Sequence, residues 1–171
     1  MTEPLFESEN LAMHCFDVSD GAFIFELLNS AGWKKFIGDR SINTLADALN
    51  YINTGPLVSY QTNGYGGWMV SLKSTGDPIG MCGLFKRDYL AGPDLGFAFL
   101  PGFEGKGFAY ESCLAAIKYV RDTYRLKQLY ATTVEINPRS QRLLTRLGFT
   151  ASGTIGPPVA AVDLLLYTLQ L

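Results

Sequence analysis

The spacing of apolar residues near the start of the chain predicts two amphipathic helices. Apolar side chains recur three and four residues apart in segment 20–30, at Phe23, Ile24, Leu27 and Leu28, and in segment 43–53, at Leu45, Ala48, Leu49 and Ile52. That interval places each set on one face of a helix. The run from Asn53 to Pro56 ends the second helix, because glycine and proline disfavour its continuation.

Alternation of apolar and polar residues, together with aromatic and β-branched runs, predicts strands in the rest of the chain. These strands are expected at Trp68 to Leu72, Ile79 to Phe85, Asp94 to Leu100, Gln128 to Val134 and Asp163 to Leu169. Residues 74–78 and 87–93 have the composition of turns, and residues 153–158 are expected to break the chain after Phe149.

The order of these elements predicts an α/β fold of the α+β type, built on one mixed sheet. Residues 94–134 form a strand, a helix and a strand, so these two strands should be parallel and joined by a right-handed crossover. Hairpin connections should make the remaining sheet antiparallel, so we expect a mostly antiparallel sheet with helices on both faces.

The segment between the strand at 94–100 and the following helix predicts a polyanion site. Pro101 ends the apolar run, and Gly102, Gly105 and Gly107 follow it. Helical spacing then begins, at Cys113, Ile117, Val120 and Tyr124. Glycines allow a close backbone approach, and the first N–H groups of a helix attract negative charge. The expected ligand is a phosphate ester.

Three types of phosphate-binding loop can be compared with this segment. A Walker A loop needs a hydroxyl residue after its lysine, but Gly107 follows Lys106. A dinucleotide fingerprint beginning at Gly105 would place Tyr110 where its third glycine belongs. The run Glu104 to Ala109 resembles the pyrophosphate loop of the GNAT acetyltransferases, [QR]-x-x-G-x-[GA], and departs from it at Glu104. An ordinary glycine-rich turn is the remaining alternative.

A second segment, NPRSQRLLTRLGF at 137–149, distinguishes these alternatives. Asn137 is a favourable N-cap and Pro138 suits the first helical position, so helix capping alone would explain them. Gly148 should end this helix. In its place after the glycine turn, however, the segment resembles the second GNAT signature, N-x-x-[SA]-x-x-L-x-x-x-L-G-F. The matching residues are Asn137, Ser140, Leu143, Leu147, Gly148 and Phe149.

The resemblance extends over nearly the whole chain and is strongest to the RimJ/RimL-like branch of that family. The segment Trp33 to Arg40, WKKFIGDR, is similar to a W-x-x-F-I-G-D-R motif of the branch, and Pro78 to Leu84 is similar to its central hairpin strand. The resemblance implies a GNAT fold, acetyl-CoA as acetyl donor and an amine as acceptor. It implies no metal cofactor.

The resemblance also assigns residues to the coenzyme. Residues Gly105, Lys106, Gly107, Phe108 and Ala109 would bind the pyrophosphate through backbone N–H groups, with Glu104 beside them. A carboxylate there is unfavourable unless it points outward, and we expect it to form a screened surface pair with the adjacent Lys106. The preceding strand would splay from its parallel neighbour and pair with pantetheine through Phe97 to Leu100, and an N–H near Phe99 would polarise the thioester. Asn137 would bond the pantetheine arm and Ser140 would lie near the sulfur.

The resemblance assigns the catalytic acid and base less completely than it assigns the coenzyme-binding residues. Many GNAT enzymes place a tyrosine acid where this chain has Leu144, which leaves Ser140, or a water that it holds, to assist the departing thiolate. Asp94 stands where a carboxylate base is often found, and Glu135, Asp163 or a chain of ordered waters are its alternatives.

The acceptor is expected between segments 29–41, 59–67 and 153–162. These segments hold the substrate-binding residues that we predict, namely Trp33, Phe36, Arg40, Tyr60 and Tyr65. Peptide N-termini, aminoglycosides, polyamines and amino acids all remain open as acceptors. Members of the family are often dimers, so a homodimer also remains open for this protein.

Composition is consistent with this interpretation. The chain of 171 residues is long enough for one domain, 1–171, and its net charge of −2 gives no electrostatic reason to bind nucleic acid or an anionic membrane. Because no apolar run reaches transmembrane length and the N-terminus lacks the features of a signal peptide, we expect a cytoplasmic protein. Cys15, Cys82 and Cys113 should be reduced thiols, and the single histidine, His14, should be packed rather than metal-bound.

Two other function classes remain open from the sequence. A non-catalytic module that binds acyl-CoA would keep the glycine loop without the acceptor chemistry, and the absent tyrosine favours it modestly. The other class is a nucleotide-binding protein that binds ATP through the same turn. The absence of the Walker lysine–hydroxyl pair argues against it.

Overall fold

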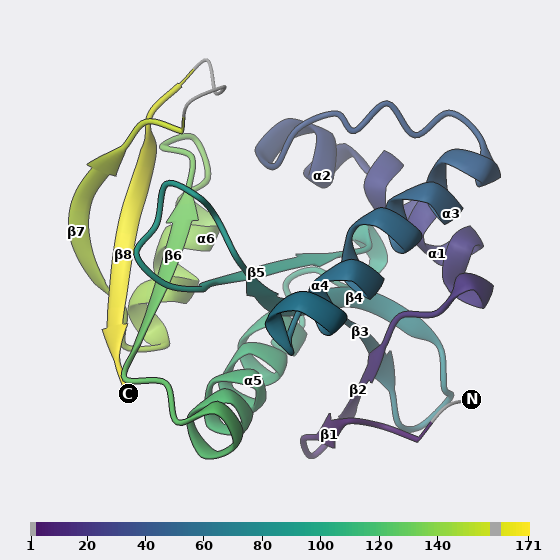
Figure 1. Cartoon of the computed structure of the whole chain (residues 1–171), viewed down its shortest axis with the longest axis horizontal. Coiled ribbons are helices and arrows are strands. Elements are labelled where there is room, and N and C mark those ends of the chain that lie inside the picture. Colours follow the sequence, from purple (N-terminus) through teal and green to yellow (C-terminus); the bar gives the residue numbers. More distant parts are fainter. Residues whose placement is uncertain (1–2, 158–161) are drawn as a thin grey trace.

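The computed structural model describes residues 3–157 and 162–171 and contains one sheet of eight strands in the order β1-β2-β3-β4-β5-β6-β8-β7. All neighbouring strands pair antiparallel except β5 and β6, which are parallel. The predicted fold class is therefore confirmed (Figure 1). The strands are β1 (Phe6–Glu7), β2 (Leu11–Cys15), β3 (Gly67–Leu72), β4 (Pro78–Phe85), β5 (Asp94–Phe99), β6 (Gln128–Thr133), β7 (Thr150–Ile155) and β8 (Leu164–Gln170).

Two apolar clusters cover the two faces of this sheet. The first joins α5 (Phe108–Tyr124) and α6 (Pro138–Arg146) to one face, through buried residues such as Cys113, Leu129 and Leu144. The second joins α1 (Gly21–Asn29), α2 (Ala31–Phe36) and α3 (Leu45–Thr54) to the other face. Helices therefore lie on both faces, as the sequence predicts.

The parallel strands β5 and β6 separate almost as soon as they meet. Asp94 opposite Tyr130 is their one register pair, and the N–H of Tyr130 donates to the carbonyl of Pro93 at 3.0 Å. Figure 1 shows the two strands diverging from this point. One edge of β5 beyond Asp94 is thus free of a neighbouring strand, and the predicted splay is confirmed.

Local capping explains where the helices begin and end. Thr44 and Asp47 form a reciprocal capping box at the start of α3, and Gly55 follows its last turn before Pro56. At α6 the side chain of Asn137 caps the helix, Pro138 occupies its first turn, and Gly148, with φ of +94°, follows its end. These boundaries match the sequence prediction closely.

Several elements were not predicted. Strands β1 and β2, helices α2 and α4 (Pro56–Asn63) and strand β7 all lie in segments that lacked a clear pattern. The expected break at 153–158 is wrong for residues 153–155, because these continue β7 against β8. Residue 158 lies outside the described residues. The W-x-x-F-I-G-D-R segment, Trp33 to Arg40, begins within α2.

The single histidine and two of the three cysteines are buried in the interior. His14 is buried, with Nε2 3.1 Å from the Ser71 hydroxyl. All three cysteines are free, and burial raises the pKa of the Cys113 thiol well above its usual range, which makes it a poor nucleophile. Within residues 3–157 and 162–171 there is no cluster of metal-ligating side chains and no helix long and apolar enough to span a membrane.

Candidate active site

The turn between β5 and α5 presents unpaired backbone N–H groups. Gly105 and Gly107 adopt positive φ angles of +73° and +89°, which glycine reaches without steric cost. Gly107 is the N-cap of α5, and no side chain caps this helix. In the described chain no hydrogen bond engages the N–H groups of residues 105–109. Unpaired N–H groups at a helix start are the local geometry that the predicted anion site requires.

The surroundings of the turn leave room for a bulky anion. Residues 104–107 are exposed, and a Cβ placed on Gly107 or Gly102 would meet nothing within 4 Å. Lys106 does not reach across the turn, because its Nζ lies 5.5 Å from the centroid of the Phe103 ring. The space in front of residues 105–109 is therefore open to a ligand.

The carboxylate of Glu104 is paired with Arg139 and not with Lys106. Arg139 Nη1 lies 3.0 Å from Glu104 Oε2, and the side chains of Arg139 and Glu104 are 59% and 36% exposed. The expectation of a pair with Lys106 is therefore wrong, because the first turn of α6 brings Arg139 to this carboxylate. A second contact, between the Arg146 guanidinium and the Tyr110 ring at 4.0 Å, also joins α6 to the first turn of α5.

This ion pair yields a prediction for coenzyme affinity. The Glu104→Gln variant should bind CoA about two- to fivefold more tightly at low salt, because it removes a negative charge beside the site and frees Arg139. Calorimetric titration of CoA measures the effect. The Arg139→Gln variant is the matched control and should bind more weakly. Equal dissociation constants for Glu104→Gln and the natural chain would show that this carboxylate does not act on the ligand.

The edge of β5 that faces away from β4 carries free backbone groups. The N–H of Leu100 donates to the carbonyl of Ile79 at 2.9 Å, toward β4. Because N–H groups alternate between the two edges of a strand, those of Phe97 and Phe99 face the opposite edge. That edge has no partner strand beyond Asp94. The side chains of Phe97 and Phe99 pack on the first apolar cluster, and that of Leu100 packs on the second.

Asn137 and Ser140 lie together at the start of α6. Asn137 Oδ1 accepts the N–H of Ser140 at 3.1 Å, so the capping interpretation of this residue is correct. The cap leaves the amide nitrogen of Asn137 without a partner among the described residues, and the Ser140 hydroxyl also makes no hydrogen bond there. Both side chains are half-buried. Leu144, at the position of the family tyrosine, is 1% exposed and belongs to the first cluster.

Asp94 is a buried carboxylate at the point where β5 and β6 separate. It is 4% exposed, and Arg87 Nε lies 3.3 Å from its Oδ1. Burial raises the pKa of Asp94 to about 6, although Arg87 partly offsets the rise. The two alternatives, Glu135 and Asp163, are both exposed. Among the three carboxylates, Asp94 has the environment of a group that accepts protons near neutral pH.

The residues predicted to bind the acceptor fall into two groups. Tyr60 serves the scaffold, because its hydroxyl donates to the Gly67 carbonyl and accepts the Phe16 N–H at 3.1 Å. Tyr65 is half-buried with its ring centroid 6.0 Å from that of Tyr124. The remaining three belong to α2 and the segment after it: Trp33 is buried, Phe36 is half-buried and Arg40 is exposed.

Trp33 carries an unusual polar atom. Its Nε1 is the only fully buried side-chain nitrogen or oxygen in the described residues that lacks a hydrogen-bond partner. A buried donor without an acceptor costs on the order of 1–3 kcal/mol. The indole therefore offers an unused N–H on the face of the sheet opposite α5.

Arg87, which pairs with Asp94, was not among the site residues predicted from the sequence. It belongs to the loop 86–93 that joins β4 to β5 and lies beside β6 (Figure 1). The loop was interpreted as a plain turn. No local pattern could have shown that Arg87 meets Asp94, because the contact depends on how this loop folds back onto the start of β5.

Comparisons with known proteins agree with this geometry. Residues 10–150 match the family described as an acetyltransferase (GNAT) domain. The chain is 23% identical over 155 residues to the uncharacterized N-acetyltransferase YoaA of Bacillus subtilis, an alignment that covers 89% of this chain and 86% of that protein. Over 59 residues it is 37% identical to the ribosomal protein uS5-alanine N-acetyltransferase of Escherichia coli, covering 34% of this chain and 30% of that protein.

A solved structure shows the same fold over the full length. The ribosomal L7/L12 α-N-protein acetyltransferase RimL, crystallised with coenzyme A, superposes with a TM-score of 0.84 at 15% identity and covers 99% of this chain and 98% of its own. The family match spans most of the chain and contains both the glycine turn and α6. The chain therefore belongs to the GNAT acetyltransferase family and is an acyltransferase.

Proposed function

We propose that the protein transfers the acetyl group of acetyl-CoA to a primary amine, by direct attack of the amine in a ternary complex. The observation that carries the proposal is the juxtaposition of an uncapped helix start at Gly107 with the unpaired edge of β5. Both features would bind an extended phosphorylated thioester, because neither has a competing partner among the described residues. The family match covers residues 10–150, and β8, which follows them, belongs to the same sheet. Both observations support one catalytic domain.

The coenzyme would be held by backbone groups along one continuous path. The N–H groups of residues 105–109 would bind its pyrophosphate, and the free edge of β5 at Phe97 to Leu100 would pair with its pantetheine arm. Acetyl-CoA supplies the activated acyl group. The N–H of Phe99 would then stabilise negative charge on the thioester oxygen, since a positioned donor acts where charge develops.

Asn137 and Ser140 would complete the coenzyme site from α6. The unpartnered amide nitrogen of Asn137 can donate to a carbonyl of the pantetheine arm, while its oxygen keeps the helix capped. The Ser140 hydroxyl would solvate the departing sulfur. A hydroxyl is too weak an acid to protonate a thiolate completely, so Ser140, or a water that it holds, would mainly stabilise the leaving sulfur by a hydrogen bond until solvent protonates it.

Asp94 would accept the proton of the attacking amine. An amine attacks only when neutral, so a nearby base with a pKa close to neutral pH assists it. Asp94 meets this requirement because burial raises its pKa to about 6. Its place at the divergence of β5 and β6 sets it beside the strand edge that would hold the thioester.

Replacement of Ser140 separates binding from catalysis. The Ser140→Ala variant should lower kcat by about three- to tenfold, with little change in KM for acetyl-CoA, because the hydroxyl would act mainly on the leaving thiolate. Ser74→Ala, in the exposed turn between β3 and β4, is the matched control. Steady-state kinetics decide the question: a rise in KM at unchanged kcat would make Ser140 a binding residue only.

The direct test of the proposed function is a turnover screen. Acetyl-CoA consumption and the mass of each product are measured with short peptides, amino acids, polyamines and aminoglycosides. We expect a mass gain of one acetyl group on the amine of at least one class. The buried Leu144 in place of the usual tyrosine favours a second candidate, a module that only binds acyl-CoA. That module would be stabilised by CoA in a thermal-shift assay and would show no turnover.

A further inference from the structure

The ion pair between Glu104 and Arg139 joins the two segments in which the coenzyme site is proposed. Glu104 precedes the glycines of the turn that follows β5, and Arg139 lies in the first turn of α6, between Asn137 and Ser140 in the sequence. Arg139 Nη1 lies 3.0 Å from Glu104 Oε2. The pair therefore connects the segments that follow β5 and β6, the two strands that diverge beyond Asp94 (Figure 1).

The guanidinium of Arg139 also lies beside the backbone of the turn. A Cβ placed on Gly105 would lie 3.6 Å from Arg139 Nη2. Gly105 is the first of residues 105–109, whose N–H groups make no hydrogen bond in the described chain. One guanidinium nitrogen thus contacts the carboxylate of Glu104, and the other is close to the N–H groups that would bind a diphosphate.

The glycine turn itself has no excess positive charge. In residues 104–109 the charge of Lys106 is balanced by that of Glu104. Lys106 Nζ also lies 5.5 Å from the centroid of the Phe103 ring, which interacts with the ammonium. Backbone N–H groups carry only partial charges, whereas a diphosphate is negative on both phosphates. Arg139 would therefore supply, from outside the turn, the charge that the turn lacks.

The contact between Arg139 and Glu104 can be exchanged at little cost. Both side chains are exposed, and an ion pair at such a surface contributes little to stability. A guanidinium binds phosphate in a bidentate geometry through charge-assisted hydrogen bonds, which are stronger than neutral ones. A diphosphate that enters the turn should therefore draw the guanidinium away from the carboxylate.

Glu104 has space to stay in place when its partner leaves. A Cβ placed on Gly32, in α2, would lie 3.1 Å from Glu104 Oε1. Because glycine has no side chain there, the carboxylate fits between α2 and α6. Movement of Arg139 to a phosphate therefore requires no rearrangement of α2.

We propose that Arg139 is a diphosphate-binding residue of the coenzyme site, and that Glu104 holds its guanidinium beside the turn until a phosphate replaces the carboxylate. This assignment rests on the proposed function and adds a charged side chain from α6 to its coenzyme site. One ion pair breaks and another forms, and no proton is transferred. The carboxylate competes with the coenzyme for the guanidinium.

Calorimetric titration with CoA and with 3′-dephospho-CoA tests the assignment. The Arg139→Gln variant should raise the dissociation constant by about tenfold for both ligands, because both carry the diphosphate and the variant loses a charge-assisted hydrogen bond to it. Arg139→Lys keeps the charge without the bidentate geometry, so its affinity should lie between those of the natural chain and Arg139→Gln. All three proteins should melt at the same temperature, because the side chain is exposed.

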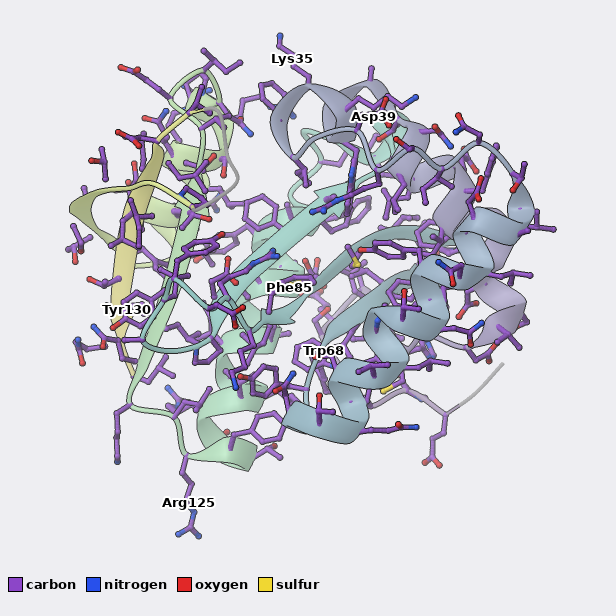
Figure 2. All side chains as sticks on the ribbon, turned by 45° about the horizontal axis from the view of Figure 1, so that its top comes forward. Lys35, Asp39, Trp68, Phe85, Arg125 and Tyr130 are labelled. Carbon is purple, nitrogen blue, oxygen red and sulfur yellow. The ribbon has the colours of Figure 1, made fainter. Side chains whose placement is uncertain are left out.

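A distant arginine provides the control for net charge. Arg125→Gln removes the same charge at the far end of α5, and Figure 2 shows Arg125 at the lower edge of the molecule. This variant should bind both ligands within about twofold of the natural chain, because solvent and salt screen a charge at that distance. An equal loss of affinity in Arg125→Gln and Arg139→Gln would show an effect of net charge and would overturn the assignment.

The remaining outcomes separate this assignment from the proposed function. Unchanged affinity of Arg139→Gln for both ligands would overturn the assignment, and acetylation of an amine by the natural chain would still uphold the proposed function. A loss of affinity for CoA alone would place the guanidinium on the 3′-phosphate and would also overturn the assignment. If the natural chain binds neither ligand, the assignment and the proposed function both fail.

Discussion

The Gly107→Glu variant should lose CoA binding while it keeps its fold. The new carboxylate would project from the N-cap of α5 into the space where the pyrophosphate is expected, and like charges in contact cost several kcal/mol. We therefore expect the dissociation constant for CoA to rise at least about 100-fold. Nothing lies within 4 Å of a Cβ at this position, so the packed core is not disturbed. Calorimetry of CoA binding measures the effect.

A second variant separates the charge from the backbone. Gly107 has a φ of +89°, where most side chains are strained but asparagine is tolerated better. Gly107→Asn should lose only a few-fold in CoA affinity and should melt at nearly the same temperature as Gly107→Glu. If Gly107→Glu binds CoA as tightly as the natural chain, the glycine turn is not the coenzyme site.

The Asp94→Asn variant should lower kcat by about 100-fold or more at pH 8, because general-base assistance contributes on that order. In the natural chain kcat/KM should fall as the pH is lowered through about 6, where Asp94 becomes protonated and can no longer accept a proton. The variant should lack this inflection. Glu135→Gln and Asp163→Asn, which alter the two exposed alternatives, serve as controls and should retain both the rate and the pH profile.

Stability should change in the opposite direction to activity. Burial raises the pKa of Asp94 from 3.8 to about 6, so its ionisation weakens the folded state by about 2–3 kcal/mol above pH 6. This penalty is absent below the unfolded pKa and is complete once the pH exceeds the folded pKa. Asp94→Asn should therefore melt at the same or a higher temperature than the natural chain at pH 8, and the difference should narrow toward pH 4. An inactive variant with a lower melting temperature at pH 8 would point to a structural role instead.

The parts of the fold that the sequence predicts well are those encoded by neighbouring residues. The capped start of α6 at Asn137 and Pro138, and its end at Gly148, follow from local backbone chemistry. The glycine turn is equally local, because positive φ and a helix start depend on the residues of the turn itself. These features carry both signatures of the family.

The parts that could not be predicted depend on the surroundings of each segment. Strand β2 is buried on both faces, so Leu11 to His14 show no alternation, and a short apolar run does not distinguish strand from helix. Strand β7 is exposed almost throughout and is fixed by pairing with β8 rather than by its own apolar pattern. Both were missed for these reasons.

The candidate site shows the same limit. Glu104 could be placed beside the coenzyme from the loop alone, but its partner Arg139 lies 35 residues away on another helix. The pair of Arg87 with Asp94 was equally hidden, since it depends on how the loop 86–93 folds back onto the start of β5. The sequence predicts residues for the coenzyme side of the site, whereas the surroundings of Asp94 can be described only from the structure.

The measurement that bears most directly on this account is a crystal structure of the protein with CoA. The account predicts the diphosphate against the backbone N–H groups of residues 105–109, with the pantetheine arm along the free edge of β5 at Phe97 to Leu100. A coenzyme bound at any other part of the chain, with this turn left open, would contradict it.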